Sequence, residues 1–186
     1  MGWLLLVLGV ALWWGAHVLK RLAPDIRART GKGAVALALA LSIVLMVIGF
    51  RAAPVIPVWT PPAFFLHINN LLVLIAIFMM SPAPKRGRLL NGMRHPMLAG
   101  FSLWAIAHLL VNGTLATLIL FGGLLAWSLT APGLINRAEP DRTPPAPGSL
   151  AKDAMFLLAS GLLMLLIGWV HYALNYCPFA ACGFYP

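Results

Sequence analysis

Long blocks of apolar residues alternate along this chain with short segments rich in Lys, Arg, Pro and Gly. Six blocks stand out, at residues 2–19, 33–50, 63–81, 96–111, 114–131 and 154–172. A helix that crosses a hydrocarbon core of about 30 Å needs about 17 to 25 mostly apolar residues, and most of these blocks reach that length. The pattern therefore predicts an all-α integral membrane bundle of six transmembrane helices.

Composition agrees with this prediction. Of the 186 residues, 61% are hydrophobic and only 9% are charged, whereas soluble domains have about 25% charged residues. The net charge of +9 comes from basic residues in short groups between the apolar blocks. Anionic membrane lipids are the partner that this pattern favours, and no basic face that would indicate nucleic-acid binding is present.

The distribution of basic residues orients the bundle. Of the 13 Lys and Arg residues, all but Arg51 lie in the first, third and fifth connecting segments. Because positively charged loops stay in the cytoplasm, both termini are predicted on the periplasmic side of a bacterial inner membrane. No basic residue precedes the first apolar block, so this block is expected to remain attached as a helix rather than to be a signal peptide.

The connecting segments predict three domains and two kinds of link. Asn112-Gly113 is a turn signal, which indicates a tight helical hairpin between the fourth and fifth segments. Residues 132–152 are rich in Pro and should be extended and irregular. We therefore divide the chain into a membrane domain (1–137), a cytoplasmic Pro-rich loop (138–153), and a sixth helix with its periplasmic tail (154–186).

Two further features leave alternatives open. Ala34, Ala38, Gly122 and Ala126 have the spacing that lets helices approach closely, although small residues are also simply common in membrane helices. Cys177 and Cys182 lie in the tail on the predicted oxidising side, where they either form a disulfide or remain thiols.

Five histidines are the main candidates for chemistry. His17, His67, His108 and His171 lie on or just inside apolar segments, and His95 lies at the start of the fourth. A His in hydrocarbon is costly unless it ligates or is hydrogen-bonded, so each is a functional candidate with interhelical hydrogen bonding as the alternative. By helical rise, His67, His108 and His171 share an outward level, and His17 and His95 lie inward.

Two helix faces indicate a flat ligand. The fourth segment carries a stripe of bulky side chains that ends in an imidazole: Met97, Phe101, Trp104 and His108. The third offers His67, Asn70, Leu74 and Phe78. Two such faces would form an aromatic slot with an imidazole on either side, which suits an iron porphyrin such as heme b, with His108 and His67 as the metal ligands. The alternative is a packed seam with a His bonded to Asn70 or to a backbone carbonyl.

His17 shares a helix face with Trp13 and Lys20, which is typical of an anchor at the lipid headgroups. The functional alternative is an inward pocket in which His17, Arg94 and His95 hold an anionic ligand. All four acidic residues lie in connecting segments, so no intramembrane carboxylate pair is available for acid-base catalysis. No phosphate-binding loop or zinc-protease helix is present either, which argues against nucleotide chemistry and ordinary hydrolysis.

The fourth segment resembles the NnrU family of bacterial membrane proteins. The matching runs are 94–100, 103–113 and 120–122, together with His17, Pro61-Pro62 and His67, and the resemblance covers roughly residues 1–137. It implies a role in denitrification, in support of nitrite and nitric oxide reductase activity, together with denitrification enzymes or another membrane subunit as partners.

That family is similar to the plant 15-cis-zeta-carotene isomerase, which uses heme b. The resemblance implies that His108 is an iron ligand and that Ala105 stands where the isomerase has Cys, which places isomerase-like chemistry in doubt. It also points to His17 as the other ligand. The depth of the residues in their helices instead favours His67, with His17 as a weaker candidate.

A second similarity is to isoprenylcysteine and phospholipid methyltransferases, which share the pattern Arg94-His95-Pro96-x-x-x-Gly100. It implies binding of S-adenosylmethionine at the cytoplasmic face, but the later acidic pair of those enzymes is missing. Three hypotheses therefore remain: a heme-binding membrane protein, a methyltransferase relative, and a non-catalytic assembly or interaction subunit.

Overall fold

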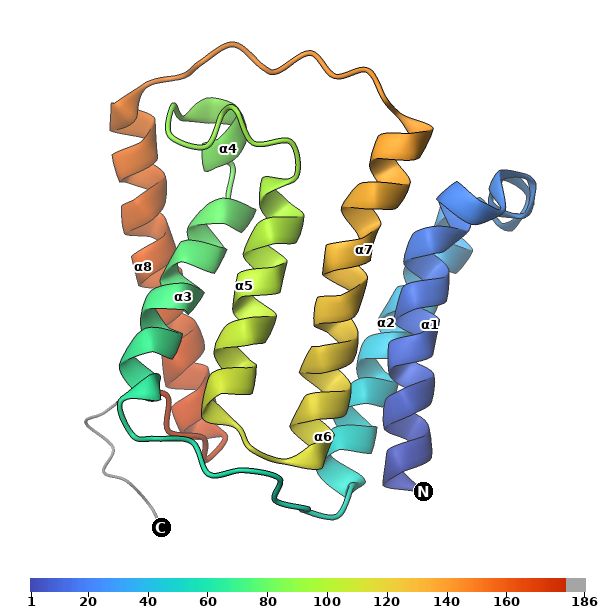
Figure 1. Ribbon diagram of the computed structural model, residues 1–186, viewed down its shortest axis with the longest axis vertical. Coiled ribbons are helices and arrows are strands. Elements are labelled where there is room, and N and C mark those ends of the chain that lie inside the picture. The colour runs from blue at the N-terminus through green and yellow to red at the C-terminus, as the bar shows by residue number, and fades with distance from the viewer. Residues whose placement is uncertain (180–186) are drawn as a thin grey trace. The chain divides into compact units, whose positions relative to one another are not determined.

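The computed structural model describes residues 1–179, and these residues form α-helices and connecting loops without a β-strand (Figure 1). This confirms the all-α prediction. The helices are α1 (Gly2–Leu22), α2 (Pro24–Ala52), α3 (Phe65–Met80), α4 (Ala83–Arg86), α5 (Pro96–Val111), α6 (Leu115–Thr117), the π-helical turn η1 (Leu118–Gly122), α7 (Gly123–Ala138) and α8 (Leu150–Ala173).

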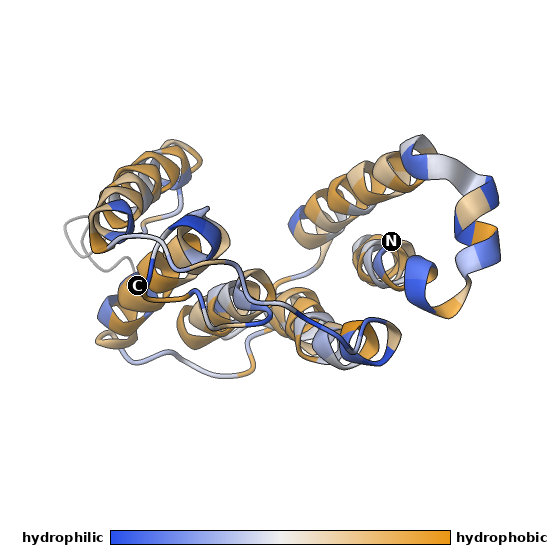
Figure 2. Ribbon diagram, turned by 90° about the horizontal axis from the view of Figure 1, so that it is seen from above, coloured by the Kyte–Doolittle hydropathy of each residue, from blue (hydrophilic) through white to orange (hydrophobic). Residues whose placement is uncertain are grey.

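Four helices within residues 1–179 are long and apolar enough to cross a membrane. They are α1, α2, the continuous helix Leu115–Ala138, and α8. The helices α3 and α5 are equally apolar but have only 16 residues, which gives a length of about 24 Å against a hydrocarbon core of about 30 Å. In Figure 2 the helices are mostly orange, and the hydrophilic residues gather on the segments that connect them.

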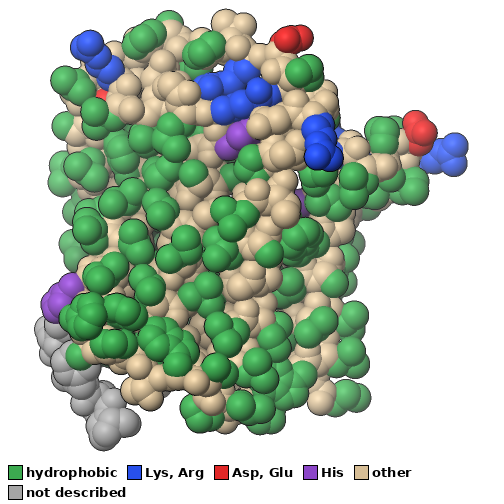
Figure 3. Space-filling model, viewed as in Figure 1, with side chains coloured by type: hydrophobic (Ala, Val, Ile, Leu, Met, Phe, Trp, Pro, Cys, Tyr) green, Lys and Arg blue, Asp and Glu red, His purple; other side chains and the backbone are tan. Residues whose placement is uncertain are grey.

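Large apolar side chains cover the outside of the helices, as the green surface in Figure 3 shows. On α8, for example, Leu158 is 67% exposed and Leu166 is 57% exposed. A water-soluble protein would bury such residues, because each exposed leucine loses about 2 kcal/mol of burial free energy. Lipid chains are the environment in which this surface is stable.

Four helices extend beyond the apolar blocks that predict them, and α1 does so by three residues, to Leu22. α2 begins at Pro24 rather than at residue 33, because Pro at the first helical turn and Asp25 beside it both favour a helix start. α7 continues through Pro132 to Ala138. α8 begins at Leu150, where the Ser149 side chain accepts the backbone N–H of Lys152. The extended Pro-rich link is therefore shorter than predicted, at residues 139–149.

The chain divides into two compact units, each built from separate stretches of sequence. Unit 1 comprises Met1–Thr60 and Gly113–Pro140, and unit 2 comprises Pro61–Asn112 and Asp141–Pro186. The predicted domains, with boundaries at residues 137 and 153, are continuous stretches of sequence, whereas each unit joins two separate stretches. That division stays a prediction.

In unit 1, α1 and α2 pack closely through glycines. A Cβ atom added at Gly49 would collide with the backbone of Leu6, and one at Gly9 would lie 2.7 Å from the backbone nitrogen of Met46. Only glycine permits such close contact between helix backbones. At Gly122, by contrast, an added Cβ would meet no atom of the described residues within 4 Å, so of the two alternatives for this glycine the structure favours a small residue without a close contact.

α2 bends at Gly31. Its φ of 75° and ψ of 168° lie outside the helical region, in a conformation that side-chain-bearing residues rarely adopt. The bend separates the charged beginning of α2 from its apolar remainder.

α1 also contacts α7, and two side-chain hydrogen bonds join the two helices. Trp14 Nε1 donates to the Gly123 carbonyl at 2.9 Å, directly after the π-helical turn. At the ends of the same helices, Arg21 donates to Glu139 at 2.6 Å. The carboxyl ends of α1 and α7 therefore lie side by side within unit 1.

In unit 2, α3 packs against both α5 and α8. The buried amide of Asn69 donates to the Ala107 carbonyl of α5 at 3.0 Å. At Gly100 an added Cβ would lie 2.8 Å from the Ala76 carbonyl oxygen. The helices α3 and α5 therefore approach each other closely at Gly100 and are joined by the Asn69 amide.

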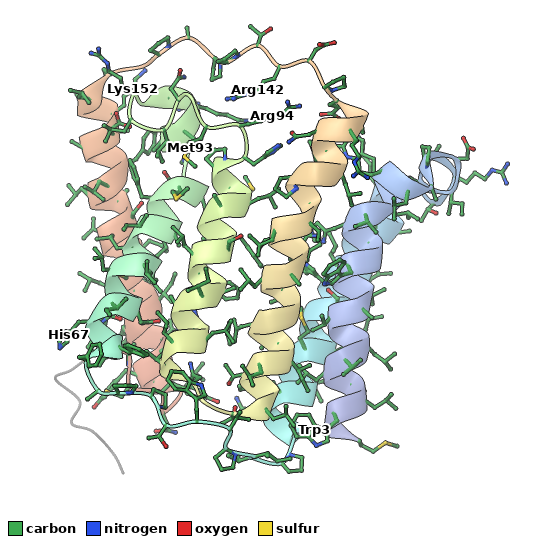
Figure 4. All side chains as sticks on the ribbon, in the orientation of Figure 1. Trp3, His67, Met93, Arg94, Arg142 and Lys152 are labelled. Carbon is green, nitrogen blue, oxygen red and sulfur yellow. The ribbon has the colours of Figure 1, made fainter. Side chains whose placement is uncertain are left out.

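The link at residues 141–149 is fastened to the loop before α5. The Arg142 guanidinium donates to the Met93 carbonyl at 2.7 Å and to the Gly92 carbonyl at 3.1 Å, and Asn91 donates back to Ala146. Figure 4 shows Arg142, Arg94 and Met93 at the same end of unit 2. The link is irregular, as predicted, but it is held in place.

Candidate functional site

The candidate site is the end of unit 2 where α3 begins and α5 and α8 end (Figure 1). His67 lies in the first turn of α3, and His108 and His171 lie in the last turns of α5 and α8. Three imidazoles from three helices therefore share one level of unit 2.

The aromatic stripe of α5 forms as its spacing predicts. The ring centroids of Phe101 and Trp104 are 5.0 Å apart, and those of Trp104 and His108 are 4.9 Å apart, with tilted planes in both pairs. Met97 continues the stripe at the other end of α5, where it is 64% exposed. The three rings thus form a continuous ladder that ends in an imidazole.

The hydrogen bond of His108 determines which ring nitrogen could bind a metal. Its Nδ1 donates to the Trp104 carbonyl at 2.9 Å, and since a carbonyl can only accept, Nδ1 carries the proton. In the neutral ring the lone pair is then on Nε2. Histidines that ligate metals commonly donate their second nitrogen to a carbonyl in this way, which fixes the tautomer and the ring.

His171 has the same arrangement, because its Nδ1 donates to the Ile167 carbonyl at 2.8 Å. Its ring lies 6.5 Å from that of Tyr176. Two imidazoles with Nε2 lone pairs are therefore present at this end of unit 2.

His67 is arranged differently. It is exposed, and Figure 4 shows it on the outside of the ribbon, pointing away from the helices of unit 2. Its role as an iron ligand stays a prediction.

Asn70 does not bond to a histidine ring. Its backbone N–H donates to the side-chain oxygen of the neighbouring Asn69 at 3.3 Å, and its side-chain amide donates to the Pro178 carbonyl at 3.1 Å. It therefore holds the tail after α8 against α3. The hydrogen bond from α3 to α5 beside His108 comes from Asn69, which donates to the Ala107 carbonyl. In the sequence, the pair of adjacent amides in an otherwise apolar segment is the feature that indicates a polar contact.

In unit 1, His17 lies between two tryptophans. Its ring centroid is 4.3 Å from that of Trp13 and 4.4 Å from that of the buried Trp127. Its Nδ1 donates to the Trp13 carbonyl at 2.9 Å, so the Nε2 lone pair recurs here. His17 belongs to unit 1 and Arg94 and His95 to unit 2, so their joint pocket stays a prediction.

Arg94, His95, Pro96 and Gly100 build the start of α5. His95 is the N-cap and Pro96 the first helical residue, where Pro is favoured. Gly100 lies close against α3, where an added Cβ would be 2.9 Å from the Met79 Cβ. The helix start and its packing thus account for Pro96 and Gly100 without a bound cofactor.

Cys182 lies outside the described residues 1–179, so its pairing with Cys177 stays a prediction. Within those residues no group of three or more His, Cys, Asp or Glu side chains is arranged to hold a metal ion. A ligand set of two imidazoles, as in heme, needs no such group.

Comparison with known proteins gives one match. The model of the NnrU protein family matches residues 5–178, which extends through α8 and so is wider than the resemblance over residues 1–137. No curated protein and no solved structure matches the chain. Since the family model spans nearly its whole length, the chain belongs to the NnrU family.

Proposed function

We propose that this protein is a heme-binding, multi-pass protein of the bacterial inner membrane that supports denitrification. The observation that carries the proposal is the tautomer of His108 and His171 at one end of unit 2: in both rings Nδ1 donates to a backbone carbonyl, so Nε2 is the nitrogen that can act as a ligand. The link to nitrite and nitric oxide reductase activity comes from the resemblance of this chain to other members of the NnrU family.

The donor set at this end of unit 2 fits heme b. His108 would be the first iron ligand, and Trp104 and Phe101 would provide flat walls. For the second ligand we favour His171 over His67, because His171 has the same ring tautomer as His108, whereas His67 points away from the helices of unit 2. Bound heme would supply electron transfer or binding of a diatomic gas.

The two propionate groups of heme b are negatively charged, so the positions of the basic residues bear on how a heme would be oriented. The basic residues of unit 2 are Lys85, Arg86, Arg88, Arg94, Arg142 and Lys152, which lie at the opposite ends of α3, α5 and α8 from His108. The propionates would therefore face water or polar side chains at the histidine end of the unit.

Six crossings, with both termini in the periplasm, complete the proposal. In each unit the Lys and Arg side chains gather at one end, apart from Arg51 at the other end of unit 1. α3 and α5 would cross if the bilayer thins locally or if their flanking residues enter the headgroup region, at a modest cost per ångström.

An absorption spectrum of the detergent-purified protein from heme-replete cells tests heme binding. We expect a Soret band that His108→Ala abolishes. His171→Ala should convert a six-coordinate spectrum to a five-coordinate one, and His67→Ala and His17→Ala serve as matched controls. A colourless wild-type protein would contradict the proposal, and loss of the six-coordinate signature only in His67→Ala would restore His67 as the ligand.

The denitrification role needs its own test. In a denitrifying host that lacks the protein, we expect nitrite and nitric oxide reductase activity to fall and wild-type protein to restore it. If the variant lacking all five histidines restores it equally, the protein is an assembly or interaction subunit that does not need heme.

The methyltransferase alternative rests on Arg94 and His95 at the basic end of unit 2. Calorimetry with S-adenosylmethionine would support it if binding occurs and is lost in His95→Ala. Absence of binding would remove it.

A further inference from the structure

An open apolar groove runs between α1 and α7 of unit 1. From α1 it is lined by Trp14, Val18 and Leu22, and from α7 by Leu129, Gly133 and Leu134. Its volume is about 370 Å³, within the range of roughly 300 to 1,000 Å³ that is usual for small-molecule sites. The groove is therefore large enough for a ligand and mostly offers it hydrocarbon.

Two features of α7 keep the groove open and its wall apolar. At Gly133 an added Cβ would meet no atom within 4 Å, so the missing side chain leaves space. The hydroxyl of Thr130, which also lines the groove, donates to the Ala126 carbonyl at 2.9 Å. The one hydroxyl of the wall is thus engaged within its own helix.

A cation closes one end of the groove. Arg137 lines it in the last turn of α7, and within residues 1–179 it has no ion pair or hydrogen bond. Its neighbour Glu139 is engaged elsewhere, since it accepts from Arg21 at 2.6 Å and lies 4.0 Å from Lys20. The end of the groove at Arg137 therefore carries a positive charge.

The length of the groove matches one leaflet. Leu129 and Arg137 are eight residues apart on a helix, which corresponds to about 12 Å along its axis. Half of a hydrocarbon core of about 30 Å is about 15 Å. A lipid whose phosphate lies at Arg137 would thus place the upper part of its chain in the groove.

From this geometry we infer that the groove binds one acyl chain of an anionic phospholipid, with the phosphate held by Arg137. Apolar walls alone would accept any lipid chain. The guanidinium at the mouth adds selectivity for a headgroup with net negative charge. This site is separate from the histidines of unit 2 and does not depend on heme.

Quenching of Trp14 fluorescence provides the test. The full chain is placed in phosphatidylcholine bilayers that contain a small fraction of either phosphatidylglycerol or phosphatidylcholine brominated near the top of one acyl chain. The Trp14 signal is the difference between the wild type and Trp14→Phe. We expect brominated phosphatidylglycerol to quench this signal at about fivefold lower mole fraction, in line with one basic residue at an anionic surface.

Three variants sharpen the result. Arg137→Gln should remove the preference for phosphatidylglycerol, while Arg29→Gln, an exposed cation elsewhere in unit 1, should keep it. Gly133→Leu fills the groove without a clash, so it should weaken quenching by both lipids. Circular dichroism confirms that each variant is folded.

Several outcomes would overturn the inference. Equal quenching by the two brominated lipids, or a preference that survives in Arg137→Gln, would show an ordinary lipid-facing surface. Displacement of the lipid by soluble glycerol 3-phosphate at similar concentration would show an anion site in which the acyl chain plays no part.

Discussion

The Asp153 carboxylate accepts the backbone N–H of Arg88 at 2.7 Å, and the same oxygen accepts that of Leu89 at 3.1 Å. Asp153 is buried, with 2% of its surface exposed. An acidic residue in the first turn of α8 therefore fastens that helix to the loop after α4. A Cβ at Gly87 would collide with the same carboxylate, so the loop is shaped around it.

Asp153→Ala should lower the free energy of unfolding by about 1.5 to 3 kcal/mol, the usual contribution of hydrogen bonds to a charged group. Asp153→Asn keeps an acceptor and should lose less. Thermal unfolding in detergent measures both, with the exposed Asp141→Ala as the control. A loss in Asp141→Ala equal to that in Asp153→Ala would contradict the assignment.

Gly49→Ala should destabilise unit 1 by about 1 to 3 kcal/mol, because the new methyl group would overpack the contact with Leu6. Gly15→Ala is the matched control, since a Cβ there meets nothing within 4 Å. Its helix propensity should make it neutral or slightly stabilising. Thermal unfolding of the two variants compares them, and equal midpoints would argue against close packing of α1 and α2.

Arg142→Ala should release the link at residues 141–149, since three carbonyls of the segment before α5 lose their donor. We expect proteinase K to cut this link several-fold faster than in the wild type. Lys152→Ala removes a nearby exposed cation and should leave the rate unchanged. The same rate in both variants would mean that Arg142 does not hold the link.

Cysteine labelling tests the proposed topology. In a background with Cys177→Ser and Cys182→Ser, Val55→Cys should react with a membrane-impermeant maleimide in intact cells, and Thr143→Cys only after lysis. Both positions are exposed, so access to the reagent is set by the membrane. The opposite pattern would invert the bundle, and labelling of both in intact cells would exclude the six-crossing arrangement.

The positions of the helices follow from the sequence because hydrocarbon imposes a minimum length of apolar residues. The ladder of Phe101, Trp104 and His108 likewise follows from three- and four-residue spacing, which stacks side chains on one helix face. Both properties are local, and both are present in the structure.

Other features depend on how each helix is rotated against its neighbour, which a single helix does not encode. Hydropathy could not indicate that Gly49 rather than Gly122 marks a close approach. It could not place His67 on the outside of α3 or select Asn69 over Asn70 as the clamp to α5. Hydropathy also does not indicate the polar beginning of α2, because a helix outside hydrocarbon needs no run of apolar residues.

Gly31 resolves a mismatch of lengths. A straight helix of 29 residues would measure about 44 Å, well beyond a hydrocarbon core of about 30 Å. Because the chain turns at Gly31, only the stretch after it, about 30 Å long, has to match the bilayer thickness. The charged turns before Gly31 can lie along the lipid headgroups while the apolar stretch crosses the hydrocarbon. The helix therefore needs neither to tilt nor to thicken the bilayer.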